Sequence, residues 1–324
     1  MRACLQASTG WAAALLLITL GCEPAELSTE SAALSGHAEP ATTAPAEAAA
    51  PGLRASHRDS LSICWTDASC KRVLSVAHGG AWSVLGAPYD SNAALAAAYA
   101  QGVDGVKIDV RVTKDNVPVI AHSSPIKLYE SLDCANKKIE EMTAAQVTKC
   151  HRVPSSTETF QRLDEVLEYL RGKMTVELTV KRSTDYARTI QEVLARRAED
   201  FAYLEISTSE LRDLIPKISG SDRVYYLINV ASNLSEIDVL IDTIKNPRAF
   251  MVEIDPGVAI GSLISARLHP AGLRAFIYDS NGLISAAQIK AYYSQGFDVV
   301  SSNQAQNSVT ARKQINTARG ITPP

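Results

Sequence analysis

The sequence predicts an α/β protein built as a TIM (β/α)8 barrel, and three observations lead to this fold class. From Lys71 onward, short β-branched runs alternate with amphipathic helical stretches, which is typical of a parallel sheet flanked by helices. About eight such strands in ~250 residues fit a closed barrel better than a doubly wound sheet. No Gly-x-Gly-x-x-Gly turn follows the first strand, which argues against a dinucleotide-binding fold.

We expect strands where short apolar runs are rich in β-branched residues and end at a polar residue or a turn. These runs are residues 73–77, 105–110, 117–121, 174–180, 202–206, 223–228, 250–254, 273–278 and 298–301. We expect helices where apolar residues recur with the helical period, and Gly102, Gly172 and Gly296 follow three of them as C-terminal caps do. The helices are residues 92–101, 163–171, 185–197, 234–244, 260–268 and 284–295. Between His122 and about Phe160 lies a long excursion with a short helix expected at 143–149, and long loops of this kind usually cap a functional site.

The N-terminal region has the pattern of an export signal. Arg2 precedes an apolar run that is too short to span a bilayer, and the run ends at Cys22. The segment 1–21 resembles a bacterial lipoprotein signal, in which Cys22 would carry the lipid; the alternative is a plain secretory signal. Residues 22–60 are rich in Ala, Pro and Thr and form an expected disordered tether, because this composition cannot bury a core. The chain is therefore expected to be exported, either anchored at the cell envelope or secreted.

Composition and cysteine content fit an exported domain at residues 61–316, followed by a tail at 317–324. The net charge of −3 does not indicate a nucleic-acid surface, and the oligomeric state stays open. The four cysteines after the tether allow three connectivities. We expect the local pairs Cys64–Cys70 and Cys134–Cys150, because each closes a short loop. Metal binding by these cysteines is the alternative, but their spacing matches no standard zinc pattern.

Polar residues at the ends of predicted strands mark a candidate site. His78 and His122 each end an apolar strand, and the carboxyl face of a barrel is where such groups are displayed. Lys107 and Asp109 alternate along the strand between them and share one face. Two cations, Lys107 and Lys181, and two histidines suit a phosphodiester substrate. Lysine neutralises phosphate charge, while one histidine deprotonates the nucleophile and the other protonates the leaving oxygen.

Several glutamates lie deeper along the same predicted strands. Glu177 shares a face with Lys181, Glu205 shares a face with Ser207, and Glu253 is expected on the inward face. Buried charges are costly unless they are paired. Two interpretations of these glutamates therefore remain open: paired inner-barrel charges without direct chemistry, or part of a polar pocket at the barrel mouth.

Several motifs resemble those of the glycerophosphodiester phosphodiesterase family and its phospholipase C-like relatives. The similar segments are A-H-G-G at 77–80, P-Y-D-S at 88–91, G-V-D-G-V-K-I-D-V at 102–110, T-K-D-N-V-P-V-I-A-H at 113–122, T-V-K at 179–181, G-L-R-A-F-I-Y at 272–278 and Q-G-F-D-V-V at 295–300. The resemblance covers about residues 70–305. It implies a TIM barrel in which His78 and His122 act as acid and base. It also implies that a neighbouring substrate hydroxyl attacks phosphorus, giving a cyclic phosphodiester that some members then hydrolyse.

The same resemblance implies a Ca²⁺ or Mg²⁺ ion held by three carboxylates, and here the sequence departs from the family. The three positions are Lys107, Asp109 and Thr179, so only one carboxylate remains. Three further positions depart from the family pattern. Gly79 stands where the family has an Arg after the first histidine, Tyr89 where it has a Glu after Pro88, and Ser123 where it has an Asp after the second histidine.

Three mechanisms follow from these departures. In the first, the Lys107 ammonium stands in the metal's place, as an Arg does in bacterial phosphatidylinositol-specific phospholipases C, and Asp109 pairs with it or with a histidine. In the second, the barrel has lost catalysis and only binds a phosphorylated lipid or sugar. In the third, a metal is held by Glu177 or Glu253. We expect the first, with His78 as base and His122 as leaving-group acid.

Under this expectation, the protein cleaves a glycerophosphodiester or a phospholipid headgroup while tethered to a membrane surface. No cofactor is expected. A weakly held Ca²⁺ or Mg²⁺ at Asp109 stays open, because a hard divalent ion needs several anionic oxygens.

Overall fold

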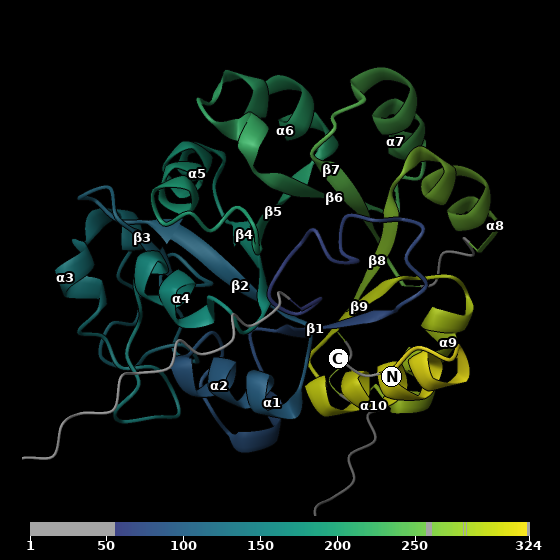
Figure 1. Cartoon of the computed structure of the whole chain (residues 1–324). Helices are drawn as coiled ribbons and strands as arrows, with labels where there is room; N and C mark the ends of the chain where they lie inside the picture. Colours follow the sequence, from purple (N-terminus) through teal and green to yellow (C-terminus); the bar gives the residue numbers. More distant parts are fainter. Residues whose placement is uncertain (1–55, 257–260, 281, 283, 323–324) are drawn as a thin grey trace, which may run out of the picture. The chain divides into compact units, whose positions relative to one another are not determined.

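The computed structural model describes residues 56–256, 261–280, 282 and 284–322. The expected export signal, Cys22 and most of the expected tether lie outside these residues. In the described part of the chain, eight parallel strands close into a barrel (Figure 1), because β1 pairs with both β9 and β2. The order β1-β9-β8-β7-β6-β5-β4-β2 follows the chain around the barrel. This confirms the TIM barrel. No helix in the described ranges has the length and apolarity needed to cross a membrane.

The strands and helices agree with most of the expected elements. The strands are β1 Leu74–His78, β2 Gly105–Val112, β3 Pro118–Ile120, β4 Thr175–Val180, β5 Ala202–Ser207, β6 Tyr225–Ala231, β7 Ala249–Ile254, β8 Arg274–Asp279 and β9 Val299–Ser302. The helices are α1 Trp82–Leu85, α2 Asn92–Gln101, α3 Ala144–Val147, α4 Leu163–Leu170, α5 Tyr186–Ala195, α6 Thr208–Asp213, α7 Ser235–Asp238, α8 Gly261–Leu263, α9 Ala286–Ser294 and α10 Ala305–Ala318. Helices α7 and α8 continue as π-helical turns at Val239–Ile244 and Ile264–Leu268.

The strand β3 differs from its expected role as one more barrel strand. It runs antiparallel to β2 and pairs with no other barrel strand. The cause is the tight turn between them, in which the Asn116 N–H donates to the Thr113 carbonyl at 2.9 Å and Asn116 has a φ of 62°. A connection this short can only join antiparallel strands, since parallel strands need a crossover. His122 therefore reaches the barrel mouth from a hairpin.

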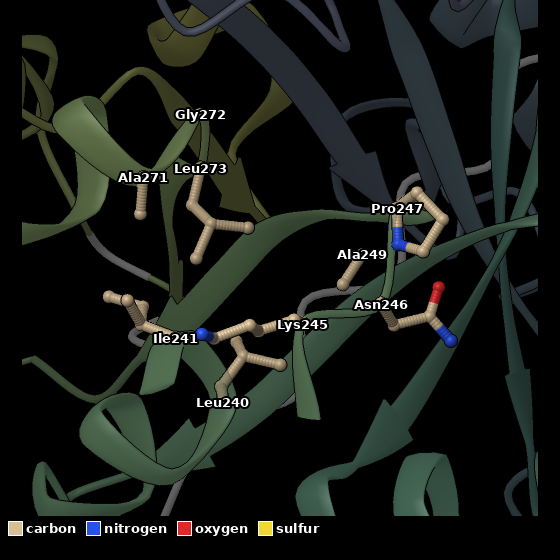
Figure 2. A pocket seen from close by; sticks show the side chains of 9 residues that line it. All are labelled: Leu240, Ile241, Lys245, Asn246, Pro247, Ala249, Ala271, Gly272 and Leu273. Atoms are coloured by element: carbon tan, nitrogen blue, oxygen red, sulfur yellow. The ribbon is translucent and has the colours of Figure 1, made fainter. Parts of the chain in front are cut away.

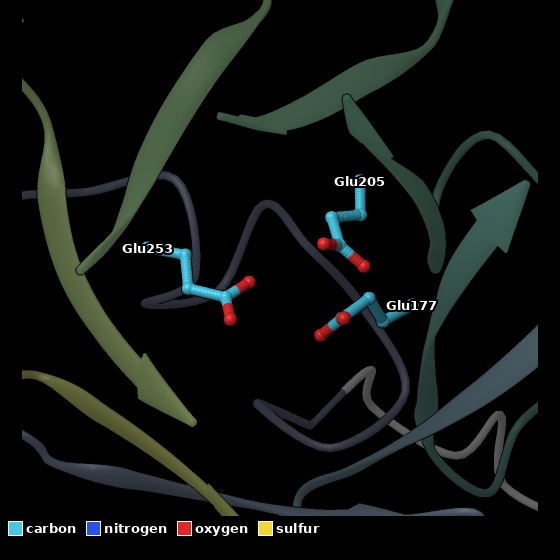
Figure 3. Close-up of side chains that lie close together, drawn as sticks. All are labelled: Glu177, Glu205 and Glu253. Carbon is cyan, nitrogen blue, oxygen red and sulfur yellow. The ribbon is translucent and has the colours of Figure 1, made fainter. Parts of the chain in front are cut away.

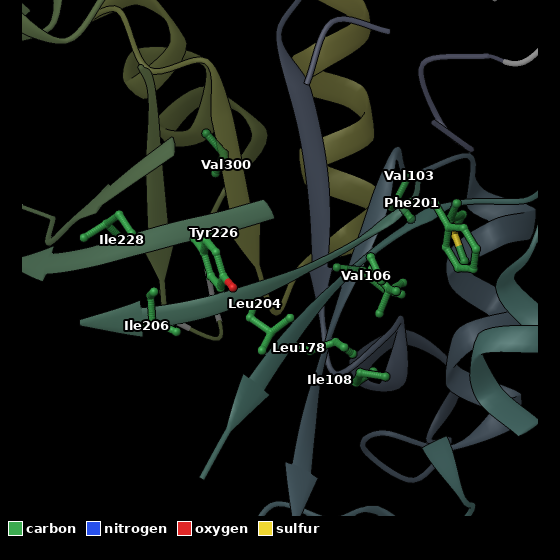
Figure 4. Packing of buried hydrophobic residues seen from close by; sticks show 14 of the residues in the cluster. Val103, Val106, Ile108, Leu178, Phe201, Leu204, Ile206, Tyr226, Ile228 and Val300 are labelled. Atoms are coloured by element: carbon green, nitrogen blue, oxygen red, sulfur yellow. The ribbon is translucent and has the colours of Figure 1, made fainter. Parts of the chain in front are cut away.

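The apolar core has two layers. The larger one fills the space between the strands and the surrounding helices (Figure 4), with Val106, Leu178 and Leu204 fully buried. A smaller cluster lies inside the barrel, where Leu61 and Trp65 pack with strand residues. Trp65 contacts the beginning of β2 at Gly105, so the segment before β1 closes the amino-terminal end of the barrel. The opposite, carboxyl-terminal end is left for polar side chains.

Residues 56–60 belong to the folded unit, which corrects their assignment to the tether. The His57 side chain is buried and its Nε2 lies 2.7 Å from Oδ1 of Asp104. Arg312 of α10 pairs with the same carboxylate at 2.5 Å. These contacts are polar, so the low apolar content of this segment does not reveal them. Burial would raise the pKa of Asp104, but Arg312 and His57 outweigh it and lower the pKa to about 2.

Both expected disulfide pairs are present in the structure. Cys64 and Cys70 lie in the segment before β1, with Cα atoms 5.4 Å apart. Cys134 and Cys150 both lie within the excursion after β3, with Cα atoms 5.7 Å apart. We call this excursion, residues 123–160, the cap. Apolar cap residues pack beneath β3 as a separate buried cluster, so the cap holds His122 from one side.

Candidate active site

One cavity at the carboxyl-terminal mouth of the barrel collects the polar side chains of the strands. Its volume is about 320 Å³. Its lining residues are His78, Lys107, His122, Glu177, Thr179, Lys181, Glu205, Asn229, Glu253, Tyr278 and Ser301. The structure therefore brings both predicted histidines and both predicted lysines into a single site.

A second hollow lies at the other end of the strands (Figure 2). It is lined by Leu240, Ile241, Lys245, Asn246, Pro247, Ala249, Ala271, Gly272 and Leu273. These residues precede or begin β7 and β8. The hollow offers one ammonium group but neither a histidine nor a carboxylate, so we do not assign the chemistry to it.

Asp109 is the centre of a buried charge cluster in the main cavity. Lys181 Nζ lies 2.6 Å from its Oδ1, and the ammonium of Lys107 contacts the same oxygen. Burial would raise the pKa of Asp109, but the two ammonium groups outweigh it and hold the pKa well below its usual range. Burial would lower the pKa of Lys107, but Asp109 outweighs it and holds that pKa above its ordinary value. Asp109 and Lys107 therefore stay ionised.

Asp90 lies next to this cluster. Its Oδ2 accepts the backbone N–H of Asp109 at 3.2 Å, and its side chain is fully buried. Burial and the neighbouring Asp109 charge raise the pKa of Asp90 well above its ordinary value. The two ammonium groups on Asp109, those of Lys107 and Lys181, both line the cavity.

His78 is held as a neutral base by its neighbours. Its Nδ1 lies 2.9 Å from Oδ1 of Asn303, whose amide nitrogen donates to the Ser280 carbonyl. Since that oxygen can only accept, the Nδ1 of His78 carries the proton and Nε2 carries the lone pair. The Tyr278 ring stacks on the imidazole with centroids 4.3 Å apart. Burial, reinforced by Lys107, lowers the pKa of His78 to about 3.

His122 is fixed through its backbone. Its carbonyl accepts two hydrogen bonds from Arg111 at 3.1 and 2.9 Å, and its N–H donates to Glu130 at 3.2 Å. Its Nδ1 lies 3.1 Å from the Ser123 hydroxyl. Within the described residues its Nε2 has no hydrogen-bond partner, so that nitrogen can face a ligand. Burial lowers the pKa of His122 from its ordinary value.

Tyr89 is a central residue of the site that sequence reasoning did not select. Its hydroxyl donates to Oδ2 of Asp109 at 2.9 Å, accepts from Lys107 at 3.3 Å, and lies 3.2 Å from Nε2 of His78. The only signal in the sequence was its position, where the resemblance places a glutamate. Asn303 was missed as well, because it follows β9 in a loop.

Gly79 and Tyr89 are sterically coupled. A Cβ atom at position 79 would lie 2.0 Å from Cε2 of the Tyr89 ring, and Gly79 has a φ of +67°. No side chain at position 79 can coexist with the ring in its present place. The two departures from the family pattern, at positions 79 and 89, therefore form one structural change.

We predict that Gly79→Ala destabilises the fold by more than about 1 kcal/mol, because it adds the contact with Tyr89 to the usual strain of alanine at positive φ. Gly102→Ala is the matched control: Gly102 has a φ of +85° and no atom within 4 Å of its Cβ position. In urea denaturation, Gly79→Ala should lower the free energy of unfolding more than Gly102→Ala does. In a protein that also carries Tyr89→Ala, the effect of Gly79→Ala should be smaller. If Gly79→Ala costs the same stability with and without Tyr89, the coupling is wrong.

The positions that the resemblance assigns to a metal do not fit a divalent ion. The Lys107 ammonium lies among them, on the Asp109 carboxylate. Thr179 donates its hydroxyl hydrogen to Oε2 of Glu205 at 2.6 Å. An ammonium and a hydroxyl in place of two carboxylates leave too little anionic oxygen for a hard cation. No step of the reaction is therefore derived through a metal at this place.

Comparisons with known proteins agree with the fold and the motifs. The family model of the glycerophosphoryl diester phosphodiesterase family matches residues 87–254. A crystal structure of a glycerophosphoryl diester phosphodiesterase from Parabacteroides distasonis ATCC 8503 has a TM-score of 0.65 and 18% identity, covering 78% of this chain and 90% of that chain. A crystal structure of a glycerophosphodiester phosphodiesterase from Agrobacterium tumefaciens str. C58 has a TM-score of 0.59 and 20% identity, covering 74% of this chain and 99% of that chain.

A third similar structure was solved with a product. It is an Oleispira antarctica phosphodiesterase in complex with sn-glycerol-3-phosphate, with a TM-score of 0.59 and 20% identity, covering 74% of this chain and 96% of that chain. The search of curated proteins found no match.

Proposed function

Because the chain belongs to the glycerophosphoryl diester phosphodiesterase family, we propose that it cleaves a phosphodiester with His78 as base, His122 as acid and Lys107 in place of the metal. As a member of this family it is a phosphoric diester hydrolase. The proposal concerns its mechanism, its substrate and its location. The observation that carries it is the pair of ammonium groups, Lys107 and Lys181, on Asp109 in a cavity that also contains both histidines.

The proposed reaction is an in-line displacement at phosphorus. The ammonium groups of Lys107 and Lys181 bind the non-bridging oxygens of the phosphodiester. A neighbouring hydroxyl of the substrate attacks phosphorus and gives its proton to Nε2 of His78, while His122 protonates the leaving alcohol as its bond to phosphorus breaks. The products are a cyclic phosphodiester and a free alcohol. Water can then open the ring, with the two histidines exchanging roles.

The charge of the site suits this reaction. A phosphodiester carries one negative charge, and a second develops as the nucleophile adds. Asp109 keeps the Lys107 ammonium charged and holds it beside that of Lys181. Groups that are already oriented toward the place where charge develops stabilise the transition state. The bound phosphate also raises the pKa of His122, which prepares it to act as an acid.

The rim of the cap favours a phospholipid over a soluble diester. Leu128, Tyr129 and Leu132 are exposed by 64%, 64% and 71%, and the exposed Lys127 and Lys137 flank them in the sequence. The Tyr129 hydroxyl lies 3.1 Å from Ser123 beside His122. Apolar side chains with nearby cations suit the surface of an anionic membrane. This surface would bring the headgroup to the barrel mouth.

The proposed location follows from the N-terminal sequence. Residues 1–21 would direct export, and Cys22 would carry a lipid that holds the barrel beside the membrane. The tether would then span the distance between the lipid and the barrel. The mass of the mature N-terminus tests this, because a lipid on Cys22 adds mass that a simple cleavage product beginning at Cys22 does not have.

Phosphorus NMR of a substrate panel tests the proposed activity. The panel contains glycerophosphocholine and glycerophosphoethanolamine in solution, and phosphatidylinositol and sphingomyelin in vesicles. We expect turnover that survives EDTA and is faster on a vesicle substrate. Loss of turnover that Ca²⁺ or Mg²⁺ restores would overturn the role of Lys107. Absence of turnover on every substrate would favour a barrel that only binds a phosphorylated ligand.

A further inference from the structure

Three glutamates inside the barrel converge on one point (Figure 3). Glu177 comes from β4, Glu205 from β5 and Glu253 from β7, and one carboxylate oxygen of each lies within 4.8 Å of the others. Glu177 and Glu253 are buried, and Glu205 is partly buried. They line the same cavity as His78 and Lys107, which come from β1 and β2. In the described part of the chain, this is the single cluster with metal-ligand spacing.

Glu253 lacks a partner although it is buried. Its side chain is 7% exposed and points toward the other two glutamates, and no described residue forms a hydrogen bond or an ion pair with it. By contrast, Glu205 accepts hydrogen bonds from Thr179 at 2.6 Å and Asn229 at 2.8 Å. Glu177 accepts one from Tyr203 at 3.3 Å. Within the described residues, the Glu253 carboxylate therefore faces the cavity without a protein partner, and a ligand or a proton would compensate its charge.

The nearby lysine does not satisfy this need. Lys107 lies opposite Glu177 in the register between β2 and β4, but its ammonium contacts Asp109 and Tyr89. Among the described residues, none of the three glutamates forms an ion pair.

From this geometry we propose that Glu177, Glu205 and Glu253 form a divalent cation site of calcium size, separate from the phosphate-binding cluster around Asp109. Calcium lies about 2.3–2.6 Å from its oxygen ligands, so the oxygens that it joins are at most about 5 Å apart, as these are. Thr179 and Asn229 orient Glu205, and Tyr203 orients Glu177, as second-shell hydrogen bonds do in metal sites.

Terbium luminescence tests the site without substrate, so its outcome does not depend on the proposed reaction. Tb³⁺ has the ligand preferences of Ca²⁺, and the Tyr203 hydroxyl on Glu177 places a sensitising ring beside it. We expect tyrosine-sensitised emission from the full chain, displaced by Ca²⁺. Glu253→Gln should weaken Tb³⁺ binding by at least ~10-fold, while Asp255→Asn, an exposed residue just after the same strand, should not. Emission that Ca²⁺ does not displace, or that Glu253→Gln leaves unchanged, would overturn the proposal.

Thermal melting provides a second readout that separates ligand loss from misfolding. Ca²⁺ should raise the melting temperature of the wild type and of Asp255→Asn, because a ligand stabilises the state that binds it. Glu253→Gln should lose this increase. Without Ca²⁺, it should melt no lower than the wild type, since it removes a buried unpaired charge. If Ca²⁺ raises the melting temperature of Glu253→Gln as much as that of the wild type, the cluster does not bind it, and the carboxylates are neutralised by protons.

Discussion

Replacing His78 or His122 by alanine is expected to lower phosphodiester turnover by at least ~10²-fold, because each histidine moves one proton in the transition state. Neither side chain carries the fold: His78 hydrogen-bonds to Asn303 at the cavity wall, and His122 is held mainly through its backbone. His151→Ala is the matched control, since His151 is an exposed cap residue paired with Asp133. Turnover measured by phosphorus NMR should fall for the first two variants and not for the control.

The two histidine variants should differ when the leaving group changes. A nitrophenol is acidic enough to leave without a proton, so a nitrophenyl diester that keeps the neighbouring hydroxyl should restore most of the activity of His122→Ala. It should restore little in His78→Ala, because the attacking hydroxyl still needs a base. If the nitrophenyl diester instead restored the activity of His78→Ala, His78 would be the acid and His122 the base. If either variant cleaved the natural substrate at the full rate, that histidine would have no part in the mechanism.

The histidines and lysines of this site could be predicted because they follow a local pattern. Strands rich in β-branched residues end at His78, and the alternation along β2 places Lys107 and Asp109 on one face. The barrel follows from the same periodicity. The direction of β3 was not predictable in this way, since it depends on the short turn at Asn116 rather than on the strand residues.

Elements held by polar contacts were missed for a related reason. Helix α10 was not expected, and its inward face includes Ser308, Arg312 and Asn316. Arg312 pairs with Asp104, and Asn316 hydrogen-bonds to the backbone of Val73. A search for apolar periodicity does not find such a face, because these side chains match partners that are distant in the sequence. The steric coupling of Gly79 with Tyr89 cannot be predicted from the sequence either, since it depends on how closely the Tyr89 ring approaches Gly79 in the folded structure.

Replacing Lys107 by methionine is expected to lower turnover by about 10²–10³-fold, the usual cost of removing one group that stabilises the charge of the transition state. The same change leaves Asp109 buried with Lys181 as its remaining cation. Removing one partner of a buried ion pair lowers the free energy of unfolding by about 3–5 kcal/mol. Because Lys181 remains beside Asp109, we expect a loss of stability near the lower end of this range. Lys114→Met is the control, because Lys114 is an exposed residue of the turn after β2.

A second substitution separates the catalytic role of Lys107 from its structural one. In Lys107→Met/Asp109→Asn the uncompensated carboxylate is gone, so urea denaturation should show much of the lost stability restored. Turnover should stay low, because no ammonium replaces that of Lys107 at the phosphate. If turnover returned together with stability, Lys107 would serve only to neutralise Asp109. If Lys107→Met kept full turnover in EDTA, phosphate binding would fall to Lys181 alone, and the idea that an ammonium replaced the metal at position 107 would have to be abandoned.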